Sequence, residues 1–446
     1  MAKPTTSRDL LVWMNGERVG VWTSSARGFQ TFVYVPEWLH SSYARPLSLS
    51  MPLVADGMRY QGEVVEHFFE NLLPDNREIR ERLRMRFGAR SGRAFDLLAE
   101  IGRDCIGAIQ LTLPDTAAPD VRRIDGRPLD EVGVAALLQR SMSGTRLGRP
   151  VEEEDFRISL AGAQEKTALL MHRGQWLQPL HATPTTHILK LPIGEGPRGI
   201  DLRLSVENEW LCAQILMAYG VPHAACWIEH FGPWKTLVVE RFDRRFMPDG
   251  TWVARIPQED LCQATATHRD QKYQADGGPG IERVMSLLLG AKEPEVDRRD
   301  FLKTQLLFWM LAAIDGHAKN FSVFLEAQGR YRLTPRYDVL SAWPVVGGAS
   351  SQLARQKLKM AMAVRGDHAL QYRWELIQAR HWRLTARRCG LSGQIDALIE
   401  EVLTQTPDVI ENVRKVLPPN FPAEVAEPIL EGLRNSAHRL MSHSSG

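Results

Sequence analysis

The chain has 446 residues, of which 44% are hydrophobic and 24% charged, and these are the proportions of an ordinary soluble globular protein. Its length exceeds what a single hydrophobic core organises, so we expect two or three domains. With 55 basic and 53 acidic residues the net charge is only +2, which gives no reason to expect strong nucleic-acid binding by this chain alone.

Membrane and extracellular classes are also disfavoured. The longest apolar run is too short to span a bilayer, and the N-terminus lacks the apolar core of a signal peptide. The five cysteines are scattered and include no C-x-x-C pair, which predicts reduced thiols in a cytoplasm and argues against a zinc site. We therefore predict a cytoplasmic protein without a membrane partner.

Residues 1–148 are predicted to form a β-rich N-terminal subdomain. It opens with a hairpin in which residues 10–14 and 17–22 flank Asn15-Gly16, a pair typical of type I′ turns. A helix is expected over residues 64–73, ended by Pro74. A linker-like stretch at 113–120 and a second break at 148–155 precede the next segment.

Residues 149–255 have the order of elements of a kinase small lobe, and residues 256–446 are mainly helical. The small lobe is predicted to hold strands at 156–160, 167–171 and 186–191, a helix at 205–219, and strands at 226–231 and 235–241. A hairpin at 321–325 and 331–334 interrupts the helical part. The predicted fold class is α+β, a two-lobed protein-kinase-like core with a mostly helical C-terminal part.

Asp315-Gly-His-Ala-Lys-Asn320 is the most informative motif. It reproduces the D-x-x-x-x-N catalytic loop of protein kinases, in which the aspartate accepts the proton of the substrate hydroxyl and the asparagine binds magnesium. The preceding residues 301–314 are apolar enough to form a buried helix. A charged loop that follows a buried helix directly is a fixed interior position suited to chemistry.

Lys190 and Glu209 are predicted to form an ion pair. Lys190 sits late in an apolar strand and could contact the α- and β-phosphates of ATP, although a lysine on an edge strand explains the same pattern. Glu209 shares its helix face with apolar residues, so a buried partner is expected, and Lys190 is the natural one. Glu207 is the competing glutamate.

Two further segments complete the predicted nucleotide site. Asp338 is a candidate magnesium ligand with Asn320, since magnesium takes one or two protein oxygens plus phosphates; alone it could equally be a turn or N-cap aspartate. The segment from Ser159 to Lys166 joins two strands and could cover the phosphates with backbone N–H groups, although a tight hairpin with Gly162 at positive φ explains it equally well.

With these motifs in view, the chain resembles the HipA family, the serine/threonine kinases that act as toxins of bacterial toxin–antitoxin pairs. The resemblance runs over nearly the whole length. It is carried by Ala44-Arg-Pro-Leu-Ser-Leu-Ser50, Glu70-Asn-Leu-Leu-Pro-Asp75, Ile158-Ser-Leu-Ala-Gly-Ala-Gln-Glu-Lys-Thr-Ala-Leu-Leu170, Val239-Glu-Arg-Phe-Asp243 and Asp276-Gly-Gly-Pro-Gly280.

The resemblance implies a role for each residue. Asp315 is the base, Asn320 and Asp338 bind Mg²⁺, and Ser159 is the autophosphorylation position, where added negative charge would push the covering loop out and inactivate the kinase. The residues expected to contact ATP are Ala161, Gly162, Ala163, Gln164, Glu165, Lys166, Lys190, the hinge Glu240, Arg241 and Phe242, and His317, Lys319 and Tyr337.

The resemblance also implies partners. The substrate class is protein, an aminoacyl-tRNA synthetase being the example, so that translation and growth slow. The usual partner is a small helix-turn-helix antitoxin (HipB-like), through which operator DNA is recognised. Arg373, Arg380, Arg383 and Arg387 are expected on one face of a C-terminal helix, where a solvated face is favoured over DNA contact.

Two departures from ordinary kinases stand beside the motifs. Ile314 replaces the arginine of His-Arg-Asp, and Tyr337-Asp-Val339 replaces Asp-Phe-Gly with no activation-loop motif after it, so activation through an arginine and a phosphosite is not expected. Two alternatives remain open at this stage. One is a small-molecule phosphotransferase with a similar site, and the other is a catalytically idle corepressor of a DNA-binding antitoxin.

Overall fold

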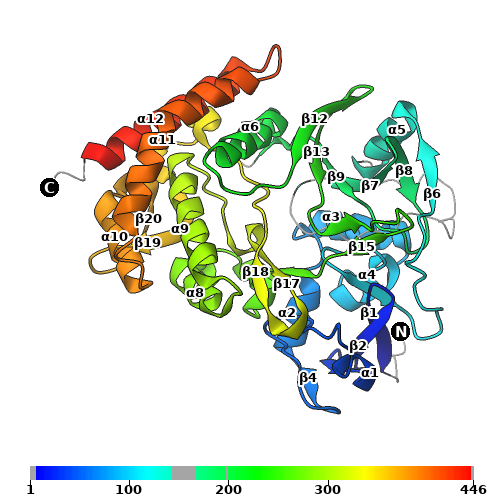
Figure 1. Ribbon diagram of the computed structural model, residues 1–446. Helices are drawn as coiled ribbons and strands as arrows, with labels where there is room; N and C mark the ends of the chain where they lie inside the picture. Colours follow the sequence, from blue (N-terminus) through cyan, green and yellow to red (C-terminus); the bar gives the residue numbers. More distant parts are fainter. Residues whose placement is uncertain (1–6, 143–163, 165, 197–198, 443–446) are drawn as a thin grey trace.

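A computed structural model describes residues 7–142, 164, 166–196 and 199–442. Three parts succeed one another along the chain: an N-terminal subdomain (blue to cyan in Figure 1), a small lobe built on an antiparallel sheet (cyan to green), and a mainly helical large lobe (green to red). None of the helices in these ranges is long and apolar enough to cross a membrane.

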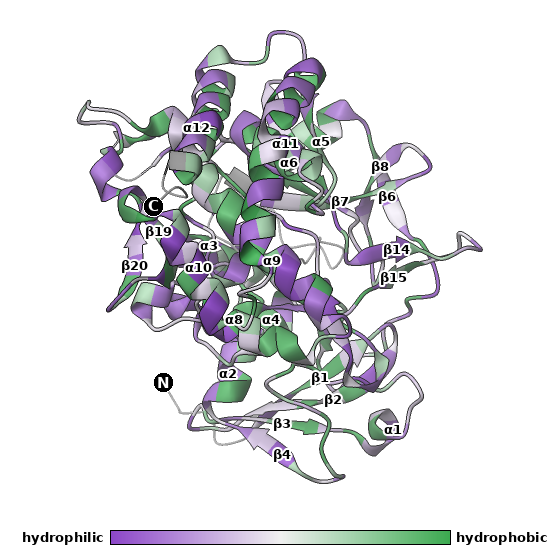
Figure 2. Ribbon diagram, turned by 60° about the vertical axis from the view of Figure 1, so that its left-hand side comes forward, coloured by the Kyte–Doolittle hydropathy of each residue, from purple (hydrophilic) through white to green (hydrophobic). Residues whose placement is uncertain are grey.

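The N-terminal subdomain is an antiparallel five-stranded sheet with four helices. Its strand order is β4-β3-β2-β1-β5. The elements are β1 (Arg8–Met14), β2 (Glu17–Ser24), β3 (Gln30–Tyr34), α1 (Pro36–Leu39), β4 (Arg59–Gln61), α2 (Glu63–Glu70), α3 (Arg77–Phe87), α4 (Ala94–Ile101) and β5 (Ile109–Thr112). Figure 2 shows α4 as a largely hydrophobic helix near β1 and β2, and Phe95, Leu97 and Leu98 of this helix are buried in the core.

The small lobe contains an antiparallel six-stranded sheet of order β12-β13-β9-β7-β8-β6. Its elements are β6 (Gly126–Leu129), α5 (Glu131–Met142), β7 (Lys166–His172), β8 (Gln175–Pro179), β9 (His187–Lys190), α6 (Ser205–Ala218), β12 (Cys226–Phe231) and β13 (Trp234–Glu240). Two short strand pairs flank it: β10 (Gly194–Glu195) with β11 (Asp201–Leu202), and β14 (Arg244–Phe246) with β15 (Val253–Arg255).

The first predicted domain boundary differs from the structure. Residues up to 148 were predicted to belong to the N-terminal subdomain, yet β6 pairs with β8, and Val134 and Leu138 of α5 pack against Leu169 and Leu189 of the small-lobe sheet. The physical reason is that an amphipathic helix packs on the sheet that buries its apolar side, so the position of a loop in the sequence does not fix the domain boundary. Only β1 to β5 form the N-terminal sheet.

The two faces of this sheet carry different helices, and this decides where Lys190 points. Leu189 and Val238 pack with α5, whereas Leu237 and Val239 pack with Val206 and Leu211 of α6. Because side chains alternate along a strand, Lys190 must point to the α6 face, opposite to its neighbour Leu189. Helix α6 ends where Gly220 takes a positive φ of 77°, as at many helix C-termini.

The large lobe combines helices with a three-stranded sheet, β16-β17-β18, and a hairpin, β19-β20. Its elements are β16 (Gln258–Asp260), α7 (Leu261–Ala264), α8 (Ile281–Leu287), α9 (Pro294–Met310), β17 (Ser322–Leu325), β18 (Tyr331–Leu333), β19 (Lys359–Arg365), β20 (Leu370–Arg373), α10 (Ala379–Arg388), α11 (Ile395–Val416) and α12 (Ala423–Ser442). Helix α9 is buried almost throughout its second half and leads into the Asp315 loop.

Most predicted elements within the described residues are confirmed, including the hairpins around Asn15-Gly16 and Gly329 and the helix starting at Ser205. The predicted strand at 156–160 lies outside the described residues. The arginine face is corrected: Arg373 ends β20, so only Arg380, Arg383 and Arg387 share α10. Arg383 pairs with Asp396 at 2.7 Å and Arg380 with Asp367 at 3.8 Å, as on a solvated face.

Buried charged and polar groups join the N-terminal subdomain to both lobes. Asp104, which follows α4, accepts from Arg244 at 2.9 Å and from Arg255 at 3.2 Å. On the other side, Glu259 of β16 accepts from the Leu49 N–H at 2.7 Å. Because buried charged or polar groups left without partners are costly, these contacts hold the subdomain in one orientation against the kinase-like core.

Candidate active site

Lys190 lies at the centre of the candidate site. Its ammonium donates to Glu209 Oε1 at 2.6 Å and to Asp338 Oδ1 at 2.7 Å. The three residues come from β9, from α6 and from the loop after β18. Lys190 is only 6% exposed, whereas the Asp338 side chain is 31% exposed. The Lys190 ammonium is thus held by a buried glutamate, and the Asp338 carboxylate beside it is partly exposed to solvent.

The charges of this group stabilise one another. Burial alone would lower the pKa of Lys190, but the carboxylates of Asp338 and Glu209 outweigh it and raise that pKa above its ordinary value. Burial likewise acts to raise the pKa of Asp338, and the ammonium groups of Lys190 and Lys166 overcome it, so that the pKa lies below its usual range. Lysine and aspartate are therefore charged at neutral pH.

The predicted pairing of Lys190 with Glu209 is confirmed, and both alternatives to it are wrong. Strand β9 lies between β13 and β7, so Lys190 is not on an edge strand. Glu207, the competing glutamate, instead accepts from Lys235 of β13. The two glutamates are two positions apart on α6 and so point to different sides of the helix, which gives each its own lysine.

Asp315 and Asn320 form the second half of the site. Asp315 is exposed, and Asn320 is 5% exposed. The Asn320 amide nitrogen donates to the backbone carbonyl of Asp315 at 3.0 Å and to that of Asp338 at 3.3 Å. This residue therefore ties the Asp315 loop to the Asp338 segment and brings both candidate metal ligands together.

The donor set fits a magnesium ion. Asp338 adopts a positive φ of 60°, a backbone conformation that is uncommon outside glycine and that Asp and Asn tolerate better than most residues. With its amide nitrogen engaged, Asn320 has its amide oxygen left to act as a metal ligand. A carboxylate and an amide oxygen are hard ligands that leave the other positions to phosphates and water, as Mg²⁺ prefers.

Several predicted nucleotide contacts surround this group. The ring of Phe242 lies 5.8 Å from that of Tyr337, an apolar pair suited to a flat base. His317 is 5% exposed, and its Nδ1 has no hydrogen-bond partner among the described residues. Burial lowers the pKa of His317 to about 4, so the ring is neutral. A neutral imidazole with an unused nitrogen can serve a ligand hydroxyl or phosphate.

The covering loop is described only at its end. Lys166 starts β7 opposite Lys190, and the side-chain amide of Gln164 donates to the Leu191 carbonyl. The other members of the predicted loop and the autophosphorylation position lie outside the described residues: Ser159, Ala161, Gly162, Ala163 and Glu165.

Two predicted nucleotide contacts have their side chains engaged elsewhere. The Arg241 guanidinium is 4% exposed and binds Asp243 at 2.9 Å and the Cys105 carbonyl at 2.9 Å. The Lys319 ammonium binds the Asn71 carbonyl at 3.0 Å and Asp260 at 3.2 Å. Both side chains therefore face the joint with the N-terminal subdomain.

Glu240, a third residue predicted to contact the nucleotide, is exposed at the end of β13. Its N–H donates to the Ala225 carbonyl at 2.8 Å.

The structure adds residues for which sequence reasoning gave no role. The Tyr273 hydroxyl donates to Asp315 Oδ1. Asp75 pairs with Lys272 at 2.8 Å and lies 3.6 Å from the Lys319 ammonium. Burial acts to raise the pKa of Asp75, but Lys319 and Lys272 lower it to about 2. Two sequence motifs pointed to these segments, the one that ends at Asp75 and the one that starts at Asp276. Both carried the family resemblance, but no contact was predicted for either of them.

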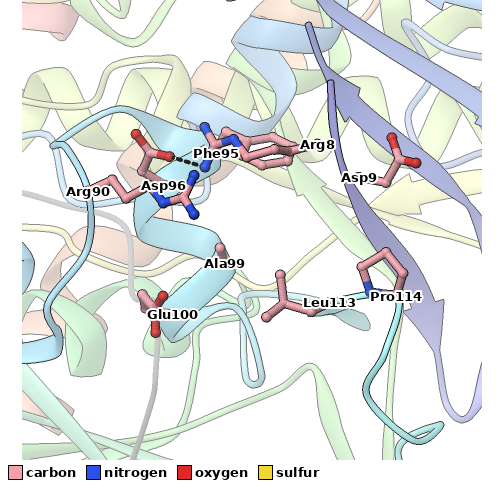
Figure 3. A pocket seen from close by; sticks show the side chains of 9 residues that line it. All are labelled: Arg8, Asp9, Arg90, Phe95, Asp96, Ala99, Glu100, Leu113 and Pro114. Carbon is pink, nitrogen blue, oxygen red and sulfur yellow. Dashed lines mark ion pairs between the residues drawn. The ribbon is translucent and has the colours of Figure 1, made fainter. Parts of the chain in front are cut away.

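A cavity of about 330 Å³ lies elsewhere, in the N-terminal subdomain (Figure 3). It is lined by residues of β1, of α4 and of the segment after β5, and none of the candidate site residues lines it. Arg8 and Asp96 form an ion pair of 2.7 Å on its wall (Figure 3). This cavity has no part in the chemistry of the Lys190 group.

Comparison with known proteins covers most of the chain. The profile of the HipA-like C-terminal domain matches residues 158–410, and that of the HipA N-terminal domain matches residues 10–112. Putative kinase Y4mE of Sinorhizobium fredii is 33% identical over 340 residues, which are 75% of this chain and 78% of the relative. Serine/threonine-protein kinase toxin HipA of Shewanella oneidensis is 28% identical over 319 residues, 69% of each chain.

A solved structure agrees with the fold. HipA in the complex of Shewanella oneidensis MR-1 HipA, HipB and operator DNA superposes with a TM-score of 0.78 at 24% identity and covers 98% of both chains. At this identity the likeness shows the fold, and it confirms the predicted α+β, kinase-like architecture.

Proposed function

Because the chain belongs to the HipA family, we propose that it is a Mg²⁺- and ATP-dependent serine/threonine protein kinase that acts as the toxin of a toxin–antitoxin pair. The observation that carries the proposal is the Lys190 ammonium between Glu209 and Asp338, with Asn320 linking Asp338 to Asp315. Phosphoryl transfer needs a cation on the phosphates, metal-binding oxygens and a base near the acceptor, and this group contains all three.

Each residue then has a defined task. Lys190 contacts the phosphates of ATP, and Glu209 keeps the ammonium in place. Asp338 and Asn320 hold Mg²⁺, which when bound neutralises phosphate charge and orients the γ-phosphoryl group. Asp315 accepts the proton of the acceptor hydroxyl while the hydroxyl oxygen bonds to the γ-phosphorus and ADP leaves with the electrons of the broken bond. Phe242, Tyr337 and His317 line the nucleotide, and the hinge from Glu240 to Phe242 meets adenine.

The acceptor is a serine or threonine hydroxyl of a protein such as an aminoacyl-tRNA synthetase, so that its phosphorylation slows translation and growth. We also propose that the kinase phosphorylates its own Ser159. A phosphate adds nearly two negative charges beside the ATP phosphates, and their repulsion would drive the covering loop out and inactivate the enzyme.

A small helix-turn-helix antitoxin is the proposed partner and carries the recognition of operator DNA. The net charge of +2 and the pairing of Arg380 and Arg383 with acidic residues fit a chain that reaches DNA mainly through a partner. A cytoplasmic location belongs to the same proposal.

The first test is the intact mass of phosphatase-treated protein before and after incubation with Mg²⁺ and ATP. The wild type should gain a phosphoryl group mapped to Ser159, Ser159→Ala should not gain it at that position, and Asp315→Asn should gain none. Reactions with ATP but without Mg²⁺ test the metal. An unchanged mass of the wild type would refute autophosphorylation.

A second test separates the toxin from the two alternatives. Expression of the wild type should arrest growth, and Asp315→Asn should abolish arrest while still binding the antitoxin. If Asp315→Asn arrested growth equally, the phosphotransfer step would not be the toxic activity. If the wild type phosphorylated a small molecule and no protein in a lysate, the acceptor class would be wrong.

A further inference from the structure

We propose that Tyr273 is a positioning residue for the base, and that its hydroxyl fixes one oxygen of the Asp315 carboxylate so that the other faces the acceptor. The inference rests on the proposed function and adds a residue to it. Its geometric basis is the hydrogen bond from the Tyr273 hydroxyl to Asp315 Oδ1. Tyr273 comes 42 residues earlier in the chain, outside the motif that contains the base.

The tyrosine is held rigidly against the catalytic loop. Its ring packs edge-on against His317, with 5.0 Å between the ring centroids. The Ala318 N–H donates to the Lys272 carbonyl at 3.2 Å, so the residue before Tyr273 is bonded to the same loop that carries Asp315. Contacts on both the ring and the backbone hold the hydroxyl at one place relative to the base.

The chain also forms a tight turn directly after Tyr273. The Tyr273 carbonyl accepts from the N–H groups of Asp276 and Gly278, each at 3.0 Å. A Cβ atom on Gly278 would lie 2.1 Å from the Gln271 carbonyl oxygen, so only glycine permits this close turn. Gln274 accepts from the Ala363 N–H at 2.8 Å and thereby bonds the segment to β19.

The N-terminal subdomain completes the support. Asp75 pairs with Lys272 at 2.8 Å, and Arg269 donates to the carbonyl of Pro74 at 3.2 Å. Asp75 also lies 3.6 Å from Lys319 of the catalytic loop. One carboxylate of the N-terminal subdomain is thus next to two lysines, one on the tyrosine segment and one on the catalytic loop, and it sets their relative position.

The contacts of Tyr273 indicate that it supports the Asp315 base and does not block it. Burial and the nearby Asp315 carboxylate raise the pKa of Tyr273, so the phenol keeps its proton and acts as a donor. A carboxylate has two oxygens, and a donor on Oδ1 leaves Oδ2 to accept the proton of the acceptor hydroxyl. A tyrosine that blocked the base would have to swing away at each turnover, yet the ring of this one packs against His317 and its carbonyl accepts from two backbone N–H groups.

The experiment compares Tyr273→Phe with the wild type in steady-state phosphorylation of the acceptor or, failing a known acceptor, in single-turnover transfer to Ser159. The ring and its packing remain, and only the hydroxyl is lost. We expect kcat to fall about ten- to a hundred-fold, as for loss of a hydrogen bond to a charged group, with KM for ATP unchanged. Tyr331→Phe is the matched control, because that hydroxyl donates to the Leu287 carbonyl away from the base; its kcat should stay at the wild-type value.

The kinetic results for Tyr273→Phe decide whether its hydroxyl positions the base. A wild-type or higher kcat for Tyr273→Phe would overturn the inference. A fall in kcat accompanied by an equal rise in KM for ATP would also overturn it, as would a fall in kcat explained by unfolding of the variant in a thermal melt. Absence of transfer by the wild type would instead mean that the proposed function fails and takes this inference with it.

Discussion

Glu259 gives a test of the joint between the N-terminal subdomain and the large lobe. The side chain is fully buried, and its two oxygens accept from the Leu49 N–H at 2.7 Å and from the Ser48 hydroxyl at 2.5 Å. Burial raises the pKa of Glu259 from 4.5 to about 8. At neutral pH the folded protein therefore contains a protonated carboxyl group, which can donate to Ser48 while the Ser48 hydroxyl turns to the Gln263 carbonyl at 3.2 Å.

The perturbation is Glu259→Gln, because an amide reproduces this neutral hydrogen-bonding pattern. The folded state binds the proton more tightly than the unfolded state, so the contribution of Glu259 to the free energy of unfolding is full below pH 4.5 and is lost as the pH rises toward about 8. Glutamine does not titrate. Between about pH 5.5 and pH 8.5 the variant should therefore gain about 3 kcal/mol relative to the wild type, at about 1.4 kcal/mol per pKa unit.

The assay is thermal unfolding of both proteins across this pH range. At about 2 cal/mol/K of unfolding entropy per residue, about 3 kcal/mol corresponds to a relative rise in Tm of about 3 to 4 °C for a chain of this size. Glu400→Gln, a change at an exposed position of α11, is the control and should keep a constant difference from the wild type. A Tm difference for Glu259→Gln that is the same at both ends of the range would refute the reasoning.

Three further predictions concern charged side chains of the candidate site and of the contacts with the N-terminal subdomain. Lys190→Ala should lower phosphate transfer at least about a hundred-fold, whereas Lys235→Ala, which removes the other lysine–glutamate pair of α6, should leave it within a few-fold; equal losses in a radiolabelled transfer assay would contradict the assignment. Asp75→Asn should lower kcat with little change in KM for ATP, since it breaks the ion pair with Lys272 and removes the carboxylate next to Lys319; an unchanged kcat would mean that the N-terminal subdomain does not support the base. Asp104→Asn should destabilise the fold by about 3 to 5 kcal/mol because it removes the carboxylate paired with the buried Arg255 and one of the two paired with Arg244, and a urea midpoint equal to that of the wild type would count against the cluster.

The sequence by itself predicted the chemistry of the site. Asp315 and Asn320 are five residues apart in one loop, and a buried helix followed directly by Asp-Gly-His is readable from local pattern. The partner of Lys190 was also predictable, because helical periodicity put Glu209 on the apolar side of its helix while Glu207 pointed elsewhere. These inferences depend on residues close together in the chain.

The tertiary structure decided what depends on residues far apart in the chain. Whether Lys190 lies at an edge or in the centre was settled by the pairing of β9 between β13 and β7, which no local pattern encodes. The family resemblance implied that Lys319 contacts the nucleotide, yet its ammonium binds Asn71, 248 residues earlier. Asp315 likewise receives its hydrogen bond from Tyr273 outside its own motif. A hydrogen bond depends on distance in space, and the spatial distance between remote segments is fixed only when the whole core packs.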